Sequence, residues 1–432
     1  MQVFSSGIYG FLLFARIWGG LGAGALTVVS PLSLSEIAPA RTRGMVVSMY
    51  MVCLLSFLSL GFFINYGVAR HMRTSNAQWQ LVQAIPLIPV FFAFVGTFFM
   101  PESPRWLATR GLHSASLASL ARLRGLDATD QKLAAEHEHL TLEADIAAEL
   151  GPNRSSNLLA SAKETFIEPT LRSRYLLLVA MHTIAQWTGG NGITYYISSI
   201  FTYAGVRGPS TSLITSGAYG LVKLVVTMVF AWFLIDRLGR RRCMLTGLAL
   251  QGGSHVYMAC YFGLNATTNH SASSAAIASV FIYAIGWSIG LCTIPYIYGT
   301  ELFPTRVRSF AYSLTMGLHW FFQFAVVRVT PVMLVRLDKW GAYVFWAGVC
   351  AVGLCVLGCW APETRGVEVE RMGELFEGAW WRCGWARLVP MVAMEEDSES
   401  VGTGATTTTA MTEKRAFAVK IKRFQSSSSS AS

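Results

Sequence analysis

Long runs of apolar residues, nearly free of charge, alternate with short polar segments along the 432-residue chain. A run of about 20 such residues can cross the hydrocarbon core of a bilayer, and helix is the expected form because lipid cannot satisfy free backbone N–H and C=O groups. The stretch from Cys243 to Thr300 contains no Asp, Glu, Lys or Arg, so we divide it at the polar segment Asn265–Ser274. The pattern then predicts nine spans, at residues 8–34, 44–67, 78–100, 176–203, 212–235, 244–264, 275–299, 309–335 and 341–361.

The composition and the placement of charge agree with a membrane protein. Hydrophobic residues make up 53% of the chain and charged residues 13%, which is about half the charged share of a soluble domain and argues against an ordinary soluble enzyme. Nine spans place the two ends of the chain on opposite sides. With Met1 outside, 26 of the 34 Lys and Arg residues fall in inner segments, five in outer loops and three within spans. Because basic residues favour the cytoplasmic side, the basic excess indicates orientation rather than nucleic-acid binding.

Two short elements occur twice along the chain at nearly constant spacing. The first carries an acid, a proline and two arginines, and its copies are 265 residues apart. The second, Pro101-Glu102-Ser103, returns 261 residues later as Pro362-Glu363-Thr364. Two similar offsets indicate a parallel repeat, one of the symmetries used by secondary transporters. In the first element the paired positions are Glu36 with Glu301, Pro39 with Pro304, Arg41 with Arg306, and Arg43 with Arg308.

The offset also predicts that the first copy is incomplete. The second copy holds six predicted spans and begins near residue 176, so the offset of 265 would start the first copy near position −89. We therefore expect the first half to lack three spans and about 90 residues. Three explanations stay open: a truncated gene model, a short isoform and a degenerate copy.

Each copy of the first element lies where a predicted span meets the cytoplasm. A carboxylate and two guanidinium groups there can bind each other when the inner faces of the halves meet, and separate when the halves part. The segment Asp236–Arg242 has the same chemistry, with Gly239 permitting a tight turn. Basic residues that only set the orientation are the alternative, but the recurrence favours a gate. The predicted gate residues are Glu36, Arg41, Arg43, Glu102, Arg105, Asp236, Arg240, Arg241, Glu301, Arg306, Arg308, Glu363 and Arg365.

Six motifs follow one another in a fixed order: Arg16–Gly24, Pro31–Gly44, Pro101–Leu107, Asp236–Arg241, Glu301–Arg308 and Pro362–Gly366. In these motifs the chain resembles the sugar porter family of the major facilitator superfamily, from Arg16 to Phe376. The resemblance implies an all-α membrane bundle of two pseudo-repeated halves, with helices four to twelve of twelve present. The domains expected are an incomplete N-terminal half at 1–104, a cytoplasmic helical linker at 105–174, a six-helix C-terminal half at 175–377 and a largely disordered cytoplasmic tail at 378–432.

One predicted span combines glycines with amide side chains at membrane depth. In the segment Gln186–Tyr196, three glycines weaken the helix and free backbone groups, while Gln186 and Asn191 carry amides that donate to and accept from hydroxyls. The spacing alone leaves two interpretations open, a solute site and helix packing through small residues and amides. The resemblance favours the solute site, because the segment matches the family's sugar-binding seventh helix. The predicted binding residues are Gln186, Asn191, Tyr195, Tyr196, His319 and Trp320.

The resemblance is incomplete in the binding segments. The family's two glutamines, its Trp-Gly-Pro and its eleventh-helix asparagine are replaced here by Ala185, Met51, Leu291-Cys292-Thr293 and His319. A site that recognises hydroxyls through hydrogen bonds discriminates through those partners. We therefore expect a changed substrate or weaker binding than for an ordinary hexose, and quinate and polyols remain open.

Arg16 and a glycine pair give two further expectations for the first span. By the resemblance, Arg16 is the coupling partner of an acid in the family's first helix. That helix is absent here, so we expect the 432-residue chain to be unstable or inactive in coupled uptake. Gly20 and Gly24 form a G-x-x-x-G that permits close helix contact.

Four other histidine, lysine or arginine residues lie within predicted spans. We expect His182 and His255 to be satisfied interior residues rather than switches. Lys223 and Arg328 either snorkel to the membrane surface or line a cavity, and the sequence does not choose between these interpretations.

The sequence thus predicts a plasma-membrane carrier that moves a sugar or related polyhydroxylated solute of the hexose, polyol or quinate class by alternating access. Proton coupling is expected only in a full-length form. A transport-deficient nutrient sensor and a nonfunctional truncated transporter are the alternatives. The sequence shows no nucleophile with a base, metal cluster or phosphate loop, so we expect no enzyme activity, cofactor or metal. We expect a monomer that contacts lipid, the solute and a proton but no nucleic acid, and Asn265 and Asn269 are glycosylation candidates in an outer loop.

Overall fold

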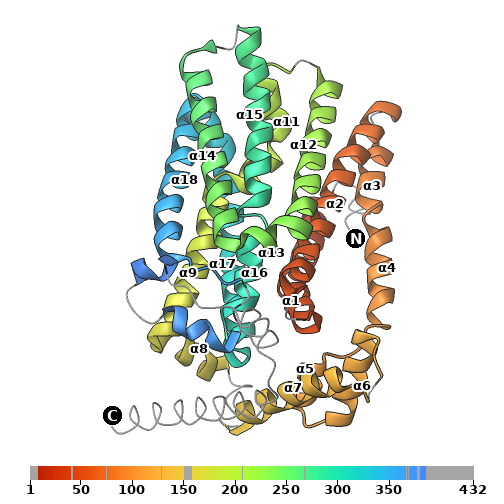
Figure 1. The fold of residues 1–432 in the computed structure, drawn as a ribbon. Coiled ribbons are helices and arrows are strands. Elements are labelled where there is room, and N and C mark those ends of the chain that lie inside the picture. Colours follow the sequence, from red (N-terminus) through yellow and green to blue (C-terminus); the bar gives the residue numbers. More distant parts are fainter. Residues whose placement is uncertain are drawn as a thin grey trace.

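The structure of the protein is a computed structural model, and it describes residues 8–39, 42–73, 75–127, 129–149, 158–206, 208–266, 269–365, 367, 369–376 and 380–385. The described residues form an all-helical bundle that stands above a cluster of shorter helices (Figure 1). This arrangement agrees with the predicted all-α membrane bundle.

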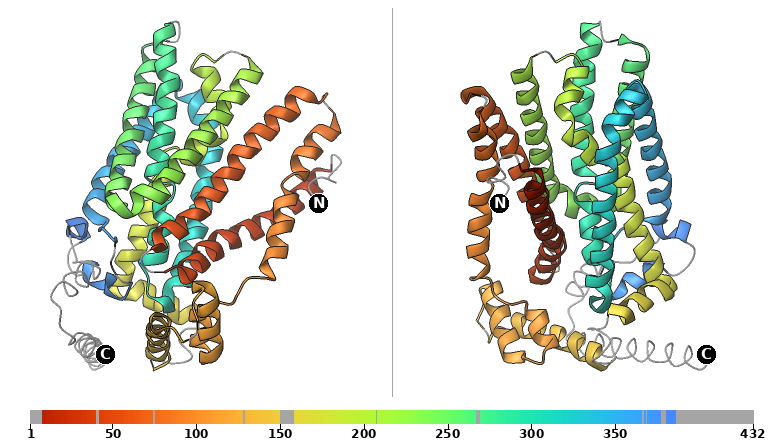
Figure 2. Two further views of the ribbon diagram at one scale, coloured as in Figure 1. Left: turned by 45° about the vertical axis from the view of Figure 1, so that its right-hand side comes forward. Right: turned by 180° about the vertical axis from the view of Figure 1, so that it is seen from behind.

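Three spans form the N-terminal half. α1 (Tyr9–Ile37) and α2 (Arg43–His71) converge at the lower end of the view and diverge towards the upper end (Figure 2). The third span is divided into α3 (Asn76–Ala84) and α4 (Leu87–Thr97). Pro86 lies in the break, and a proline interrupts a helix because it has no N–H to donate.

Four short helices occupy the predicted linker region. They are α5 (Pro104–Thr109), α6 (His113–Arg124), α7 (Gln131–Glu149) and α8 (Leu158–Ile167). α5 begins where the Ser103 hydroxyl accepts a hydrogen bond from the Trp106 N–H at 3.3 Å, with a proline at the first helical position. α5, α6 and α7 pack on one another, whereas α8 packs against helices of the C-terminal half. The cytoplasmic side of these helices stays a prediction.

The C-terminal half contains the remaining helices. The first predicted span is divided into α9 (Pro169–Trp187), α10 (Gly190–Tyr195) and α11 (Ile197–Tyr203). The next spans are α12 (Pro209–Val229) continued by the π-helix η3 (Phe230–Leu234) and α13 (Ile235–Leu238), then α14 (Arg240–Gly263), and α15 (His270–Ile289) with α16 (Ile294–Glu301). The last two spans are α17 (Thr305–Arg336) and α18 (Trp340–Trp360), followed by the 3-10 helices η5 (Val369–Phe376) and η6 (Trp380–Trp385).

Seven helical segments of the described residues are long and apolar enough to cross a membrane. Each coincides with one of the nine predicted spans, and the other two predicted spans correspond to the broken segment α9–α11 and to α14. The division at Asn265–Ser274 is confirmed, because α14 ends at Gly263 and α15 begins at His270. The seven segments are Tyr9–Ile37, Arg43–His71, Asn76–Thr97, Thr211–Leu238, His270–Glu301, Thr305–Arg336 and Trp340–Trp360.

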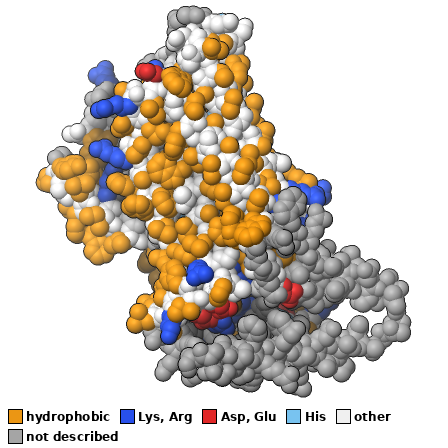
Figure 3. Space-filling view, turned by 90° about the vertical axis from the view of Figure 1, so that its left-hand side faces the viewer, with side chains coloured by type: hydrophobic (Ala, Val, Ile, Leu, Met, Phe, Trp, Pro, Cys, Tyr) orange, Lys and Arg blue, Asp and Glu red, His pale blue; other side chains and the backbone are white. Residues whose placement is uncertain are grey.

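Hydrophobic side chains cover much of the bundle surface, while acidic and basic side chains gather near its lower end and along its upper left edge (Figure 3). The chain beyond 377 was predicted to be a largely disordered tail. Its residues Trp380–Trp385 form η6, which packs against α18. The rest of that prediction lies outside the described residues.

The two halves differ in how closely their helices pack. A Cβ atom at Gly247 of α14 would lie 2.5 Å from the Gly286 carbonyl oxygen of α15, so this crossing requires glycine. In contrast, a Cβ at Gly20 or Gly24 of α1 would have nothing within 4 Å. The close helix contact that this glycine pair permits is therefore not made within the described residues, and it stays a prediction.

Helices of the two halves contact each other at several places. α2 packs along α12, and α1 packs against α17. Arg16 is exposed on α1, and none of the described residues pairs with it. Its role as a coupling partner stays a prediction.

Candidate functional site

Glycines shape the break between α9 and α10. Gly189 adopts a φ of +90°, a conformation that glycine reaches without steric cost. A Cβ at Gly190 would lie 2.2 Å from the Trp287 ring, and one at Gly192 would lie 2.4 Å from the Thr330 hydroxyl. These glycines thus let α10 pack closely against α15 and α17, in addition to weakening the helix as predicted.

The break frees the backbone carbonyl of Thr188, which interior side chains then bind. The ring nitrogen Nε2 of His255 lies 3.0 Å from this oxygen, and the Tyr283 hydroxyl lies 3.4 Å from it. His255 is therefore a satisfied interior residue, as predicted. The freed carbonyl is taken up by the protein rather than left for a solute.

A cluster of amide and imidazole side chains lies beside this break, where α9, α10 and α17 meet. The Gln186 amide nitrogen lies 3.2 Å from the His319 ring nitrogens, and His182 Nδ1 lies 3.0 Å from His319 Nδ1. The Asn191 amide nitrogen lies 3.1 Å from the amide oxygens of both Gln186 and Gln323. We call these five residues the central polar cluster. The structure thus brings together three of the six predicted binding residues.

The central polar cluster suits the recognition of hydroxyl groups. Amides and neutral imidazoles both donate and accept hydrogen bonds, as a sugar or polyol requires. In this structure the cluster members bond mainly to each other, and within the cluster His182 Nε2 is the one buried polar atom with no partner among the described residues. When a solute binds, its hydroxyls therefore replace these internal hydrogen bonds. When it leaves, the side chains bond to each other again, so emptying the site costs little free energy.

Two members of the cluster were not predicted as binding residues. His182 was expected to be a satisfied interior residue, and Gln323 was not singled out. Each lies four positions along a helix from a predicted residue, His182 before Gln186 and Gln323 after His319. Because residues i and i+4 share a helix face, a search of the two spans at this spacing would have found both.

The other predicted binding residues lie outside the cluster. The Trp320 indole nitrogen donates to the Thr27 hydroxyl of α1 at 3.1 Å, so this side chain joins the two halves. Tyr195 is 64% exposed, and neither it nor Tyr196 bonds to the cluster. Tyr296 of α16, which the sequence did not indicate, places its hydroxyl 3.4 Å from His319 Nε2.

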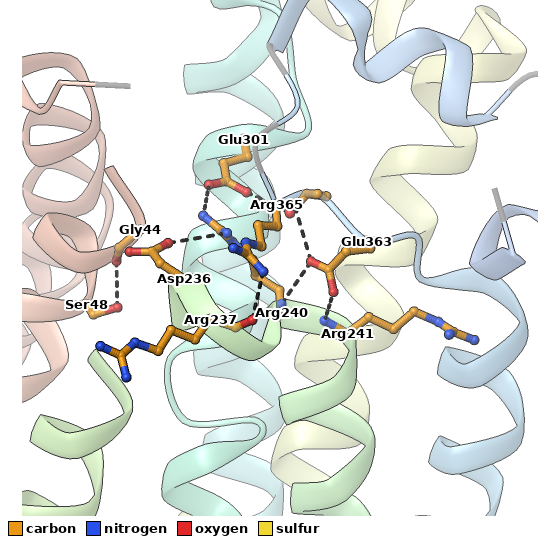
Figure 4. Close-up of polar contacts among 10 residues, drawn as sticks. Gly44, Ser48, Asp236, Arg237, Arg240, Arg241, Glu301, Glu363 and Arg365 are labelled. Atoms are coloured by element: carbon orange, nitrogen blue, oxygen red, sulfur yellow. Dashed lines mark hydrogen bonds and ion pairs between the residues drawn. The ribbon is translucent and has the colours of Figure 1, made fainter. Parts of the chain in front are cut away.

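A second set of polar residues lies at the end of the bundle, around the first residue of α14. The Arg240 guanidinium lies 3.5 Å from the Asp236 carboxylate and 3.3 Å from that of Glu301 (Figure 4). Arg240 and Glu301 are both buried. Glu301 also accepts a hydrogen bond from the Thr364 hydroxyl at 2.8 Å. The predicted pairing of acids with arginines is present here.

Glu363 binds the beginning of α14. Its two carboxylate oxygens accept hydrogen bonds from the backbone N–H groups of Arg240 at 2.9 Å and Arg241 at 3.1 Å (Figure 4). The first N–H groups of a helix have no intrahelical acceptor and carry partial positive charge. Gly239 permits this approach, since a Cβ there would lie 2.3 Å from the Glu363 carboxylate.

The first copy of the repeated element is arranged differently. Glu36 accepts a hydrogen bond from the Ser103 hydroxyl at 2.7 Å. Contact with the C-terminal half comes from Arg105, which donates to the Thr305 hydroxyl at 2.9 Å, and from Gly44, where a Cβ would lie 2.7 Å from the Arg240 guanidinium. The two halves therefore approach each other at these residues, whereas the ion pairs of Arg240 with Asp236 and Glu301 lie within the C-terminal half. A gate between the halves stays a prediction.

The remaining predicted gate residues have separate surroundings. Arg41 lies outside the described residues, Arg43 is the first residue of α2, and Glu102 is exposed. The other four bind groups near them: Arg306 pairs with Glu164, Arg308 donates to the Phe303 carbonyl, Arg241 to the Gly358 carbonyl, and Arg365 to the Arg237 carbonyl.

The two glycosylation candidates both lie just before the start of α15. Asn269 is the N-cap of this helix, and its side chain accepts the backbone N–H groups of Ser271 and Ala272. Asn265 adopts a φ of +51° in the preceding turn. Thr267, the hydroxyl residue of the first sequon, lies outside the described residues, and modification of either asparagine stays a prediction.

Comparison with known proteins identifies the family. The sequence profile of the family described as "Sugar (and other) transporter" matches residues 1–376. The chain is 29% identical over 379 residues to the quinate permease of Neurospora africana, covering 84% of this chain and 69% of the relative. It is 31% identical over 383 residues to a protein of Aspergillus niger named "Probable quinate permease", covering 85% of this chain and 69% of the relative. Among solved structures, the proton:xylose symporter XylE bound to 6-bromo-6-deoxy-D-glucose superposes with a TM-score of 0.74 at 21% identity, covering 87% of this chain and 76% of that one.

Proposed function

The chain belongs to the sugar transporter family of the major facilitator superfamily and is an integral multi-pass membrane protein, and we propose that it binds a polyhydroxylated solute at the central polar cluster and carries it by alternating access. The named relatives include quinate permeases and a xylose symporter, so quinate and pentoses are the first solutes to test. The plasma membrane is the proposed location.

The observation that supports this function most strongly is the composition of the central polar cluster. Five side chains with amide or imidazole groups converge from α9, α10 and α17 beside a glycine break in a spanning segment. Polar groups at membrane depth cost several kcal/mol when unsatisfied and mark solute pathways. The set contains no carboxylate or metal-ligand triad, so its chemistry is hydrogen bonding to hydroxyls.

The gate residues supply the second part of the proposed cycle. The Asp236–Arg240–Glu301 contacts lie within the C-terminal half, and Gly44 of the N-terminal half approaches them at one end of the bundle. Charge-assisted contacts that form at a domain interface favour one of two arrangements. We propose that opening this end of the bundle separates Arg240 from Gly44 and releases the solute.

Solute binding to the full chain in lipid nanodiscs tests the function. The rise in melting temperature with quinate, D-xylose or D-glucose reports binding, because a ligand of the folded state stabilises it. We expect at least one of the three solutes to raise the melting temperature, and Gln186→Ala or Asn191→Ala to weaken its binding at least tenfold. Asn65→Ala is the matched control, since this exposed amide bonds only to the Gly61 carbonyl of its own helix. No binding of any of the three, or equal binding by all variants, would contradict the proposal.

Uptake by cells that lack their own sugar carriers tests transport separately. Proton coupling in a full-length form is a further part of the proposal, suggested by the xylose symporter among the structural neighbours. Uptake that collapses when a protonophore abolishes the proton gradient would support coupling. Uptake that is insensitive to the gradient would contradict proton coupling.

A further inference from the structure

Lys223 is a buried cation in the middle of a spanning helix. Its exposed fraction is 2%, and it lies on α12, 13 residues before Asp236. At 1.5 Å per residue this separation is about 20 Å along the helix, too far for the lysine to reach the charged end of the bundle. Lys223 therefore does not snorkel, and its side chain stays inside the C-terminal half.

The surroundings of Lys223 supply dipoles but no opposite charge. Its ammonium lies 3.2 Å from the Thr194 hydroxyl and above the rings of Tyr219 and Trp287, at 5.5 and 5.6 Å from their centroids. Aromatic faces stabilise a cation by about 1 to 2 kcal/mol when desolvated, which is far below the cost of burying an unpaired charge. Within the described residues no Asp or Glu pairs with this lysine, and the spans predicted from the sequence contain none at its depth.

A buried arginine in the same half shows what a permanently paired cation looks like in this protein. Arg240 is buried to a similar degree, at 5% exposed, and contacts the carboxylates of Glu301 and Asp236. An ammonium group has three donors, and Lys223 uses one, towards Thr194. Two donors and one positive charge are left for a group that the described residues do not supply.

The position of Thr194 connects this lysine to the proposed solute site. Thr194 lies on the short helix α10, three residues after Asn191 of the central polar cluster. Residues three apart on a helix have Cβ atoms about 5 to 6 Å apart, and the ammonium is a further 3.2 Å from the Thr194 hydroxyl. One small molecule can therefore reach both the amides and the ammonium if α10 shifts at its flanking glycine break.

We propose that Lys223 is the counter-charge for a carboxylate on the transported solute, so that the substrate class is a polyhydroxylated monocarboxylate rather than a neutral sugar. This inference rests on the proposed function, since it assigns a charge to the solute of the same site. The hydroxyls of the solute bind the central polar cluster, and its carboxylate binds the two unused donors of Lys223. The partnership satisfies a buried cation that is otherwise unpaired.

The experiment compares quinate with its methyl ester, which keeps the ring hydroxyls and removes the charge. Binding to the full chain in lipid nanodiscs is measured by the rise in melting temperature and by tryptophan fluorescence. We expect quinate to bind at least tenfold tighter than the ester. Lys223→Met should lower quinate affinity to that of the ester while changing ester affinity by less than threefold, and Lys223→Arg should keep the preference for quinate.

Lys339→Met is the matched control. This lysine also lies above a tyrosine ring, 5.0 Å from the Tyr203 centroid, but at the end of the bundle rather than at depth. The Lys339→Met variant should bind quinate and its methyl ester with unchanged affinity. Equal wild-type affinity for acid and ester would overturn the inference even if Lys223→Met failed to fold, and so would an unchanged preference in that variant. Binding of xylose or glucose without quinate would overturn the carboxylate assignment but keep the transport proposal, whereas binding of none of these compounds would overturn both.

Discussion

The two copies of the first repeated element share one hydrogen bond of the glutamate but differ in its other contacts. In each copy the glutamate accepts a hydrogen bond from a hydroxyl of the second repeated element. Glu36 binds the Ser103 hydroxyl at 2.7 Å, and Glu301 binds the Thr364 hydroxyl at 2.8 Å. Since these pairs were matched in sequence by offsets of 265 and 261, the structure repeats the sequence symmetry in space.

The copies differ in what else the glutamate contacts. Glu301 is 5% exposed and lies against the Arg240 guanidinium, whereas Glu36 is only partly buried. The difference teaches that one hydroxyl is enough for a partly hydrated carboxylate, whereas a buried carboxylate needs a cation as well.

The largest loss of stability is expected at the two glutamates, Glu301 and Glu36, because their surroundings differ most. Glu301→Ala leaves Arg240 buried with only the more exposed Asp236, so it should lower the free energy of unfolding by about 3 to 5 kcal/mol. Glu36→Ala removes one hydrogen bond of a partly exposed group and should cost about 1 kcal/mol. Thermal unfolding of both variants in lipid nanodiscs measures the two losses. Equal losses would mean that the two copies are energetically equivalent despite their different surroundings.

The second largest loss of stability is expected in the second repeated element, where Glu102 and Glu363 occupy matching positions. Glu363 accepts the first two N–H groups of α14, whereas the Glu102 carboxylate is exposed and bonds to none of the described residues. Glu363→Gln removes the charge that faces the helix N-terminus and should cost about 1 to 2 kcal/mol. Glu102→Gln should change the free energy of unfolding by less than about 0.5 kcal/mol. Melting curves of the two variants measure both changes in stability. A loss from Glu102→Gln as large as that from Glu363→Gln would show that the two carboxylates contribute equally.

The spans and the glycine break could be predicted because they depend on local properties of the chain. Uncharged runs of the right length specify spans whatever they pack against, and the polar segment that begins at residue 265 marks the boundary between α14 and α15. Gln186 and Asn191 were likewise visible, because amides beside glycines are costly inside a membrane unless they have a role.

The partners across the bundle could not be predicted because they depend on how each helix is rotated. Trp320 follows His319 in sequence but points about 100° away on the helix and binds α1 instead of the cluster. For Lys223 the sequence left snorkelling and an inward position open. The packing of Tyr219 and Trp287 around its ammonium is a tertiary property that no single span reveals.

The third effect tests the shared part of the two copies, the hydroxyls. Thr364→Val keeps the shape of the side chain and removes the hydrogen bond to Glu301, which should cost about 1 kcal/mol. Ser103→Ala should cost a similar amount, increased slightly because this hydroxyl also caps α5 through the Trp106 N–H. Thr364→Ser and Ser103→Thr are the controls, since both keep the hydroxyl. If only one of the two losses is seen in melting experiments, the spatial symmetry has no energetic counterpart.

The smallest change in stability is expected at the contact between the halves. Two glycines of α2, Gly61 and Gly44, are compared to test it. A Cβ at Gly61 would meet nothing within 4 Å, so Gly61→Ala should stabilise the helix by up to about 1 kcal/mol. At Gly44 the added Cβ would lie 2.7 Å from Arg240 Nη2 and 3.3 Å from Asp236 Oδ1. The guanidinium is held by Glu301 and cannot move freely, so Gly44→Ala should lose the propensity gain and show a net change near zero or slightly destabilising. A gain from Gly44→Ala that equals the gain from Gly61→Ala, measured as melting temperature in lipid nanodiscs, would show that the Arg240 network does not restrain the approach of the two halves.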